Sequence, residues 1–438
     1  MEIVLKSNDV INKLLINKKI DILEGIFSLY SIKIPLDDGV LLFNQITNEL
    51  IFFHDDKDME NHKDILIEKG FYVGIGVDEK KKYDQIKKIM KLKNEKKNYI
   101  NTYVVLITTA CNARCFYCFE KKWQEEVMSE KVANDFADYI ISHQHGHEVS
   151  LTWFGGEPLM NVRAIDIISS KLKHHNIKFK ADIISNGYLF DEEIVNRCIN
   201  EWNIKRVQIT LDGSEKIYNH IKNYKNIGNA YQCVLKNIEL LLKKGLVVVI
   251  RLNVDLYNYN DLMQLAKELY NKFHKYNRFY VYSKMLFGEK YSIQQNQDKR
   301  LQAFINLQNY LYELGLFKPS NIDSTFRINS CIADSDNGFV VSPKGEISAC
   351  NNYSGIEIIS SIYRDEFDKN IILSWKEPLA QFKECEKCFL YPSCNILKKC
   401  PAEQGRCSER YKGELEYNIK MKAYHAYMNY KKENKNDI

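Results

Sequence analysis

Residues 103–118 are YVVLITTACNARCFYC, and this stretch decides the fold because it joins an apolar run to three closely spaced cysteines. The apolar run is typical of a buried strand. Cys111, Cys115 and Cys118 follow it at once, and such tight spacing can direct three thiolates at one metal centre. Three ligands leave one iron of a four-iron cluster open, and an open iron is where chemistry can occur.

Two other uses of these cysteines fit the sequence less well. A structural zinc site needs a fourth Cys or His nearby, and none follows Cys118 at a usable spacing. Disulfide bonds are disfavoured because three is an odd number and nothing in the chain indicates secretion. The sequence therefore favours an open iron-sulfur site.

The spacing Cys-x3-Cys-x2-Cys, with the aromatic Tyr117 directly before the last cysteine, resembles the signature of radical S-adenosylmethionine (SAM) enzymes. The resemblance implies a [4Fe-4S] cluster whose open iron binds the amino and carboxylate groups of SAM. It also implies reductive cleavage of SAM to methionine and a 5′-deoxyadenosyl radical, which abstracts hydrogen from the substrate. In such an enzyme the protein binds, orients and excludes water, while the cofactor carries the hard chemistry.

The composition fits a multidomain cytoplasmic enzyme. At 438 residues, 45% apolar and 27% charged, the chain can bury a large core and should form two to three domains. The formal net charge of +5 is small for this length, so we infer no nucleic-acid partner from charge. No apolar run reaches membrane-spanning length and no signal-peptide pattern is present, so we expect no membrane partner. Twelve cysteines in such a chain favour metal binding over disulfides.

The first 77 residues carry hairpin signals at 29–36, 40–44 and 49–53, which predict a small β-rich domain. This domain loosely resembles the leading domains of radical SAM peptide maturases, where a small fold can add a leader-peptide strand to its sheet edge. A cap that packs on the barrel without a binding role is the alternative.

A charge-dense segment, residues 78–101, follows this domain. Its thin apolar stripe consists of Tyr83, Ile86 and Met90. A stripe this thin predicts a solvated linker helix, in preference to a basic binding arm.

From residue 102 to about 290 strand and helix patterns alternate, which predicts a parallel sheet with helices outside and catalytic groups at the C-terminal ends of the strands. Six such units suit the partial (β/α)6 TIM-like barrel of the radical SAM family, so the fold class is α/β. We expect strands at 103–108, 149–154, 178–184, 206–211, 247–254 and 278–283. We expect helices near 130–142, 160–173, 191–202, 228–244 and 261–273.

Further motifs follow successive strands at the same edge of this sheet. Gly-Gly-Glu-Pro after the second strand is only a turn when taken alone, but in this position it resembles the segment that holds the SAM amino group. Ser-Asn-Gly after the third strand resembles the segment that contacts the SAM ribose, and Thr-Leu-Asp-Gly after the fourth resembles the family's Ser-x-Asp-Gly turn. With Tyr117, the candidates for cofactor binding are therefore Gly155, Gly156, Glu157, Pro158, Ser185, Asn186, Thr210 and Asp212.

Two cations complete the candidates for cofactor binding. Arg251 on the fifth strand places a permanent charge inside the barrel, suited to a carboxylate, and an interior structural ion pair is the alternative. Relatives often carry His-Asp-x-x-Arg shortly after Asp-Gly, whereas this chain has Lys222 in place of that arginine. If the arginine binds the SAM carboxylate, Lys222 would keep the charge but lose the bidentate fork.

The C-terminal region holds seven cysteines in under eighty residues, too many for accidental core packing. The array resembles the SPASM domain, the auxiliary-cluster module of radical SAM enzymes that modify peptides and proteins. The whole resemblance covers roughly residues 102–411 and implies two auxiliary [4Fe-4S] clusters. Five residues separate Cys394 from Cys400 where the family has three, which puts the ligand role of Cys400 in question.

The family correspondence divides these seven cysteines into two ligand sets. Cys385, Cys388, Cys394 and Cys407 would complete one auxiliary cluster. The other would be held by Cys331, Cys350 and Cys400, with its fourth position not filled by any obvious cysteine. An open auxiliary iron could accept a substrate thiolate, which would suit thioether formation at a peptide cysteine.

The remaining candidate ligands have simpler interpretations. Cys198 and Cys233 lie in amphipathic helical patterns, which predicts buried small hydrophobes. His143, His145 and His147 alternate before a strand, and a polar loop is favoured over a metal site because no partner group is evident.

The expected domain order follows from these patterns. The divisions are a β-rich domain at 1–77, a linker helix at 78–101, a radical SAM barrel at 102–290, a helical bridge at 291–330, a SPASM domain at 331–411 and a C-terminal helix at 412–438.

The leading functional hypothesis is a radical SAM/SPASM maturase that forms a thioether or carbon-carbon crosslink in a ribosomally made peptide, with a flavodoxin or ferredoxin as reductant. An anaerobic sulfatase-maturing enzyme ranks second. Those relatives carry an Asp base after the cysteine that matches Cys350, whereas this chain has Asn351, whose amide cannot take the proton. A non-catalytic iron-sulfur electron carrier ranks third. The sequence identifies neither the peptide nor a catalytic acid or base.

Overall fold

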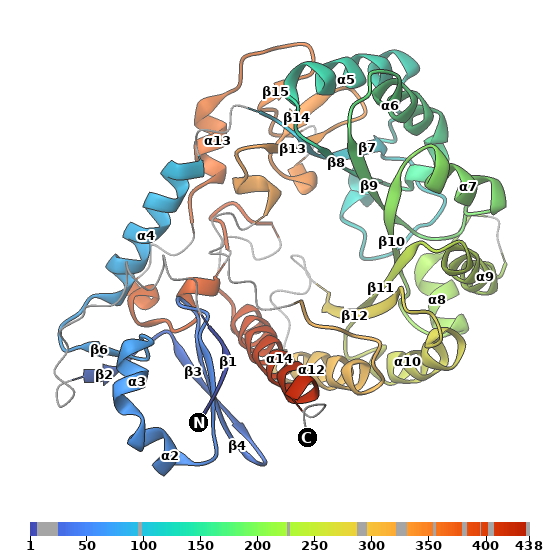
Figure 1. Cartoon of the computed structure of the whole chain (residues 1–438). Coiled ribbons are helices and arrows are strands. Elements are labelled where there is room, and N and C mark those ends of the chain that lie inside the picture. The colour runs from blue at the N-terminus through green and yellow to red at the C-terminus, as the bar shows by residue number, and fades with distance from the viewer. Residues whose placement is uncertain are drawn as a thin grey trace.

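A computed structural model describes residues 1–6, 25–94, 99–225, 228–286, 296–320, 331–353, 356–378, 383–394, 396–401 and 407–434. Its elements carry the labels of Figure 1, which shows a curved sheet with helices along its outer side. A β-rich N-terminal part and the C-terminal helix lie across from this sheet.

The centre of the fold is a nine-stranded sheet in the order β12-β11-β10-β9-β8-β7-β13-β14-β15. Along β8 and β12 every second side chain is buried and the one between is half-buried, so each strand has one face on the helices and one facing the inside of the curve. The parallel strands are β7 (Thr102–Thr108), β8 (Val149–Gly155), β9 (Phe179–Ser185), β10 (Ile204–Thr210), β11 (Val247–Val254) and β12 (Phe279–Met285). The outer helices are α5 (Glu130–His143), α6 (Val162–His174), α7 (Glu192–Asn200), α8 (Glu215–Lys222), α9 (Ala230–Lys243) and α10 (Tyr259–Phe273).

The fold class is confirmed, and the expected strands and helices of the barrel are observed with small shifts at their ends. Helix α8 was not predicted. It has only two turns, and its buried face includes Lys222 beside Tyr218 and Ile221, so it lacks a clean apolar stripe. Asn223 ends it in the left-handed conformation at φ 44°.

Strand β13 (Gly338–Val341) joins the cysteine-rich region to the barrel. It pairs in parallel with β7, with Gly338 opposite Thr102 and Val341 opposite Val105. The antiparallel β14 (Glu346–Ser348) then runs back, so Cys350 lies toward the N-terminal end of β7, whereas Cys111 follows its C-terminal end. The seven residues of β7 span roughly 20 Å, which separates the two cysteine regions along the strand direction. Short elements complete this region, namely η3 (Ile332–Asp334), η4 (Asn351–Tyr353), β15 (Ser360–Ser361), α13 (Lys369–Trp375), η5 (Lys383–Lys387) and η6 (Tyr391–Ser393).

The N-terminal part contains a four-stranded antiparallel sheet in the order β1-β5-β4-β3. Its inner face packs on the C-terminal helix and on Leu390, which lies between Cys388 and Cys394. The rings of Phe52 and Tyr427 stack with their centroids 4.8 Å apart. The predicted hairpin of residues 29–53 is confirmed. The elements are β1 (Glu2–Leu5), β2 (Gly25–Phe27), β3 (Ser31–Leu36), β4 (Gly39–Asn44), β5 (Leu50–Phe53), α2 (Asp56–Asn61), α3 (Lys63–Glu68) and β6 (Tyr72–Gly74).

Helix α4 (Glu79–Asn94) follows, as the charge-dense segment predicted. Its stripe residues Tyr83 and Ile86 are buried, while the side chain of Met90 lies outside the described residues. The Tyr83 hydroxyl donates to the Pro392 carbonyl at 3.0 Å, and its ring packs on Tyr391 at 5.6 Å. The thin stripe therefore packs on the segment between Cys388 and Cys394, and the prediction that this helix is solvated is wrong for that face.

Two long helices close the fold. Helix α12 (Gln297–Glu313) lies in the expected bridge, and α14 (Glu409–Asn434) is the expected C-terminal helix. They pack together through Phe304 and Tyr417, whose hydroxyl donates to the Asn309 amide oxygen at 2.7 Å. Among the described helices none has the length and apolar character needed to cross a membrane.

Candidate functional site

The cysteine loop, residues 109–118, leaves the C-terminal end of β7 and leads into η1 (Phe119–Lys122). Its three thiols are half-buried and close enough to interact electrostatically. Burial raises the pKa of Cys111 to about 12, so this thiol is neutral near pH 7 without metal and loses its proton when it binds iron.

The donor set of this loop fits an iron-sulfur cluster better than a single ion. Within the described ranges no group of three or more His, Cys, Asp or Glu side chains is arranged to hold one metal ion. Each iron of a four-iron cluster takes its own cysteine, so the sulfurs need not converge on one point.

The two glycines after β8 fix one side of the cysteine loop. The amides of Gly156 and Glu157 donate to the carbonyls of Thr108 and Ala110, both at 2.9 Å. A Cβ atom on Gly156 would lie 2.2 Å from the Ala110 oxygen, and one on Gly155, at φ 118°, would lie 2.1 Å from the Thr108 oxygen. Only glycine permits this approach, so the motif predicted to bind SAM also holds the backbone that carries Cys111.

The end of α8 fixes the other side of the loop. The Arg114 amide donates to the Lys222 carbonyl at 2.8 Å, and the Lys225 amide donates to the Asn112 carbonyl at 3.0 Å. The loop therefore lies between β8 and α8, which are far apart in the sequence.

Glu157 and Ser185 are turned toward each other. The fully buried Glu157 carboxylate accepts hydrogen bonds from the Ser185 hydroxyl at 2.9 Å and from the Asn186 amide at 2.7 Å. Burial raises the pKa of Glu157 to about 7 despite these bonds. These two side chains join the ends of β8 and β9, while Pro158 is buried at the start of η2 (Pro158–Asn161). Their predicted contacts with SAM stay predictions.

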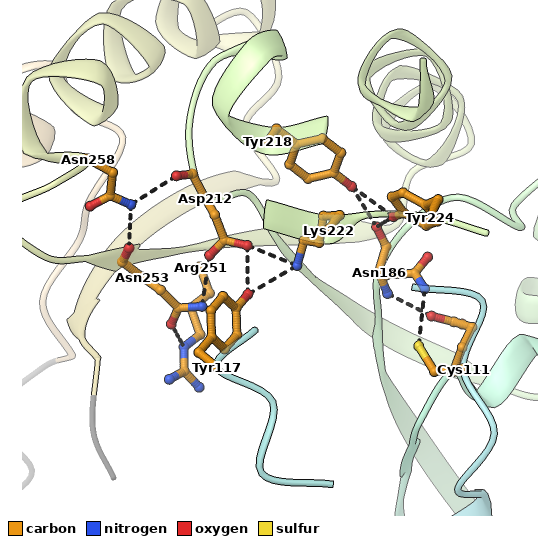
Figure 2. A network of polar contacts seen from close by, with 11 residues as sticks. Cys111, Tyr117, Asn186, Asp212, Tyr218, Lys222, Tyr224, Arg251, Asn253 and Asn258 are labelled. Carbon is orange, nitrogen blue, oxygen red and sulfur yellow. Dashed lines mark hydrogen bonds and ion pairs between the residues drawn. The ribbon is translucent and has the colours of Figure 1, made fainter. Parts of the chain in front are cut away.

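Asn186 is the predicted ribose contact that lies nearest to the cysteine loop. Its side-chain amide donates to the Asn112 oxygen at 2.6 Å and lies 4.0 Å from the Cys111 sulfur, as Figure 2 shows. Its own carbonyl accepts from the hydroxyls of Tyr218 and Tyr224, both at 3.4 Å. Neither tyrosine was predicted to contact this site, because their meeting with Asn186 depends on the fold.

Asp212 is the centre of a buried polar network that also contains Tyr117 and Lys222 (Figure 2). Its carboxylate accepts from the Tyr117 hydroxyl at 2.6 Å, pairs with the Lys222 ammonium at 3.0 Å and accepts from the Asn253 amide at 3.0 Å. The Asn258 amide donates to its carbonyl at 2.9 Å. Burial alone would lower the pKa of Lys222, but the electrostatic interactions with Asp212, Tyr117, Cys115 and Tyr218 together outweigh it and hold that pKa well above its usual range.

Arg251 extends the network toward the inside of the barrel. Its Nε donates to the Asn253 oxygen at 2.9 Å, and its outer nitrogens point away from that contact in Figure 2. The neighbouring Tyr282 hydroxyl donates to Gln208 at 3.1 Å, and the Arg251 charge lowers a Tyr282 pKa that burial raises. No carboxylate pairs with Arg251 in the part of the chain that the structure describes, so the interior ion pair considered from the sequence is not found there. Thr210, the last residue of β10, is half-buried beside this network.

Two features near the loop carried no signal in the sequence. Glu120 is 7% exposed, and one of its carboxylate oxygens has no hydrogen-bond partner among the described residues. Phe116 packs on Tyr257 at 5.9 Å, and Phe119 stacks on Phe154 at 6.4 Å, which gives the loop an apolar rim. Burial and ring contacts between distant segments depend on the fold, so neither was predictable.

The C-terminal thiols fall into two neighbourhoods. Cys407 interacts electrostatically with Cys385, Cys388 and Cys394, and Cys331 interacts with Cys400. Cys350 and Cys400 pack against the same hydrophobic core as the barrel. This grouping is compatible with the two ligand sets drawn from the family, which remain predictions.

The remaining cysteines and the histidine segment have structural surroundings. Cys198 is fully buried as predicted, and Cys233 is half-buried with its thiol directed at the Tyr188 carbonyl. His143 stacks on Tyr139 and His147 stacks on Tyr99. His143 is the last residue of α5, so the polar-loop interpretation is wrong for it and holds for His145 and His147, which follow the helix.

Comparison with known proteins identifies the barrel. Residues 105–269 match the Radical SAM superfamily, so the chain contains a radical SAM domain, and that family binds a [4Fe-4S] cluster and SAM. An uncharacterized protein of Methanocaldococcus jannaschii is 25% identical over 64% of this chain and 93% of its own length. The radical SAM cyclopropyl synthase TigE of Paramaledivibacter caminithermalis is 24% identical over 42% of this chain, and the match spans 44% of TigE.

Two solved structures share the fold. The structure of anSMEcpe with bound AdoMet superposes with a TM-score of 0.55 at 18% identity, covering 74% of this chain and 99% of that one. Streptococcus suis SuiB bound to its precursor peptide SuiA superposes with a TM-score of 0.53 at 13% identity, covering 86% of this chain and 98% of SuiB. Both matches extend well beyond the barrel.

Proposed function

We propose that this radical SAM protein is a maturase that crosslinks a ribosomally made peptide through a thioether or carbon-carbon bond. The observation that carries the proposal is the β7–β13 pairing, which puts a three-cysteine loop and a second cysteine region at opposite ends of one barrel strand. A substrate inside the barrel would lie between them. A flavodoxin or ferredoxin would supply electrons.

The cysteine loop would hold the SAM-binding cluster through Cys111, Cys115 and Cys118. Bound there, the reduced cluster and SAM supply the 5′-deoxyadenosyl radical that abstracts hydrogen from the substrate. The chain's own residues bind and orient SAM. Arg251 suits its carboxylate because the outer guanidinium nitrogens can form a bidentate pair, and Asn186 lies beside Cys111, where the ribose contact is predicted.

The auxiliary clusters would occupy the two C-terminal ligand sets. Cys385, Cys388, Cys394 and Cys407 would complete one of them, and Cys331, Cys350 and Cys400 would leave an open iron in the other. Forming a thioether breaks a C–H and an S–H bond. The 5′-deoxyadenosyl radical would take the hydrogen atom from carbon, the thiol would lose its proton, and the remaining electron would pass to the auxiliary cluster. An open auxiliary iron suits a substrate thiolate because it can favour loss of that thiol proton.

A peptide substrate is supported by two features. The inner faces of the barrel strands carry half-buried side chains such as Thr152 and Tyr282, so part of this face is accessible. SuiB, which shares the fold, binds the precursor peptide SuiA.

The predicted addition of a leader-peptide strand is disfavoured at the edge strand β3. Lys33 and Pro35 are exposed on this strand, and Pro cannot donate a hydrogen bond.

The test is mass spectrometry of a candidate cysteine-containing peptide after incubation with the reconstituted, reduced protein and SAM. Loss of two hydrogen atoms per crosslink, matched by 5′-deoxyadenosine, is expected. A peptide left unchanged while a sulfatase-derived Cys peptide becomes formylglycine would overturn the proposal in favour of the sulfatase-maturing alternative. Asn351, whose oxygen lies 4.0 Å from the Cys350 sulfur, offers no carboxylate base for that alternative.

A further inference from the structure

The Asp212–Lys222 pair lies in the interior of the protein directly behind the cysteine loop. The side chain of Lys222 is 4% exposed and that of Asp212 is fully buried, with 3.0 Å between the ammonium and the carboxylate. A buried ion pair of this kind keeps its charges only because each compensates the other. Removing one partner leaves an uncompensated charge in the interior.

The pair is tied to the loop through Tyr117, which lies between two of the cysteines. The Tyr117 hydroxyl donates to Asp212 at 2.6 Å and accepts from the Lys222 ammonium at 3.3 Å (Figure 2). The Lys222 backbone also contacts the loop, because its carbonyl accepts from the Arg114 amide at 2.8 Å. Lys222 therefore holds the loop both by its side chain and by its main chain.

Asp212 is in turn fixed to the neighbouring strand end. Its second carboxylate oxygen accepts from Asn253 at 3.0 Å, and its carbonyl accepts from Asn258 at 2.9 Å. The Lys222 ammonium already faces Asp212 and the Tyr117 hydroxyl, and its side chain is 4% exposed, which leaves little access for an incoming carboxylate. Arg251, in contrast, pairs with no carboxylate among the described residues and has outer nitrogens directed away from its bond to Asn253.

We propose that the Asp212–Lys222 pair is a clamp that holds the cysteine loop in its cluster-binding position, so that Lys222 is a positioning residue and not the anion-binding residue for SAM. The inference rests on the proposed function, since it assigns the pair a role toward the cluster held by the loop. It explains why a lysine suffices at the position where relatives have an arginine, because the Lys222 charge pairs with the protein's own Asp212 carboxylate.

The test uses the reconstituted protein with the variants Asp212→Asn, Lys222→Met, the double variant and Tyr117→Phe. Lys216→Met on the exposed side of the same helix is the control. Asp212→Asn and Lys222→Met are each expected to lose iron. The loss in each should be at least half the loss measured in Cys115→Ala. The double variant is expected to lose less than either single, because no uncompensated charge remains. Tyr117→Phe, which keeps both charges, is expected to lose less iron than either single charge variant.

A second readout is the midpoint potential of the cluster in the singles. Lys222→Met is expected to lower it and Asp212→Asn to raise it, because reduction adds negative charge beside the changed residue. A general loss of loop structure, in contrast, would not produce shifts of opposite sign in the two variants.

Two results would overturn the clamp. One is a double variant that loses as much iron as the worse single. The other is full iron retention in Lys222→Met together with a tenfold larger dissociation constant for SAM. That result would make Lys222 an anion-binding residue. Product formation is not among these readouts, so an inactive parent protein would count against the proposed function and leave the clamp result interpretable.

Discussion

The two cysteine regions differ in what holds them. The loop after β7 is anchored by backbone hydrogen bonds and by the Tyr117–Asp212 contact, all to neighbouring strand and helix ends of the barrel. The turns around Cys388 receive side chains from distant parts of the chain, since Gln45 donates to the Phe389 carbonyl at 2.6 Å and Tyr391 donates to Asp84 at 2.6 Å. The first region is thus built by the barrel's own topology, whereas the second depends on the N-terminal part. Changes in the two regions should therefore separate SAM cleavage from auxiliary iron.

The largest expected effect is that of Gly156→Ala, which attacks the first region through its backbone. Its methyl group would lie 2.2 Å from the Ala110 oxygen, so the loop must move. A displacement of about 1 Å near a reacting group costs roughly 100-fold in rate, so we expect SAM cleavage to fall by about that factor. Gly228→Ala is the matched control, because a Cβ there meets nothing within 4 Å. Similar 5′-deoxyadenosine yields from both variants would contradict this account of the loop.

Next in size is Gln45→Ala, which attacks the second region from the N-terminal sheet. The buried Gln45 donates to the Phe389 carbonyl and accepts from the Ser393 hydroxyl at 2.9 Å. Its removal leaves both partners without this hydrogen bond, which lowers stability by about 1–3 kcal/mol for each. We expect auxiliary iron to fall while SAM cleavage persists. The exposed Gln302→Ala serves as the control. Iron analysis and 5′-deoxyadenosine yields on the same samples decide the matter, and parallel losses of both would show that the regions are not separable.

A smaller effect is expected from Arg251→Gln, which sharpens the comparison within the first region. Losing a charged hydrogen bond to the SAM carboxylate should weaken SAM binding about tenfold, equivalent to roughly 1.4 kcal/mol. Arg206→Gln on the neighbouring strand, where Arg206 pairs with Asp182 at 2.7 Å, is the control. Equilibrium dialysis with SAM measures the difference, and equal affinity in all three proteins would remove Arg251 from the site.

The smallest effect is the pH dependence contributed by Glu157. Its pKa is raised from 4.5 to about 7 in the folded protein, so its contribution to stability is full below pH 4.5 and is lost as the pH rises through about 7. Glu157→Gln should flatten this decline, whereas the exposed Glu148→Gln should not. Thermal unfolding of the metal-free proteins from pH 5 to 8 measures the slope, and an unchanged slope in Glu157→Gln would refute the assignment.

The barrel was predictable because period-two apolar runs alternated with amphipathic helical patterns, and the strand ends carried the expected motifs. The internal partners of those motifs were not predictable. Glu157 accepts a hydrogen bond from Ser185, and Lys222 pairs with Asp212. Such pairings depend on which strand ends meet in space. The parallel pairing of β13 with β7 escaped prediction for the same reason, since paired residues such as Val104 and Val340 lie far apart in the sequence.

Tyr83 illustrates a further limit of sequence patterns. A thin apolar stripe in a charge-dense helix is typical of a solvated helix, yet this residue is buried against the second cysteine region. The partner surface comes from residues about 300 positions later, with the Tyr83–Pro392 bond as an example. Periodicity shows that a face is apolar but not what covers it.

The most direct test of the account is 5′-deoxyadenosine production by the reconstituted, reduced protein with SAM, compared between Cys115→Ala and Cys388→Ala. The account predicts production by the parent protein and by Cys388→Ala, and none by Cys115→Ala. Production that survives in Cys115→Ala, or that disappears only in Cys388→Ala, would contradict the assignment of SAM cleavage to the loop after β7.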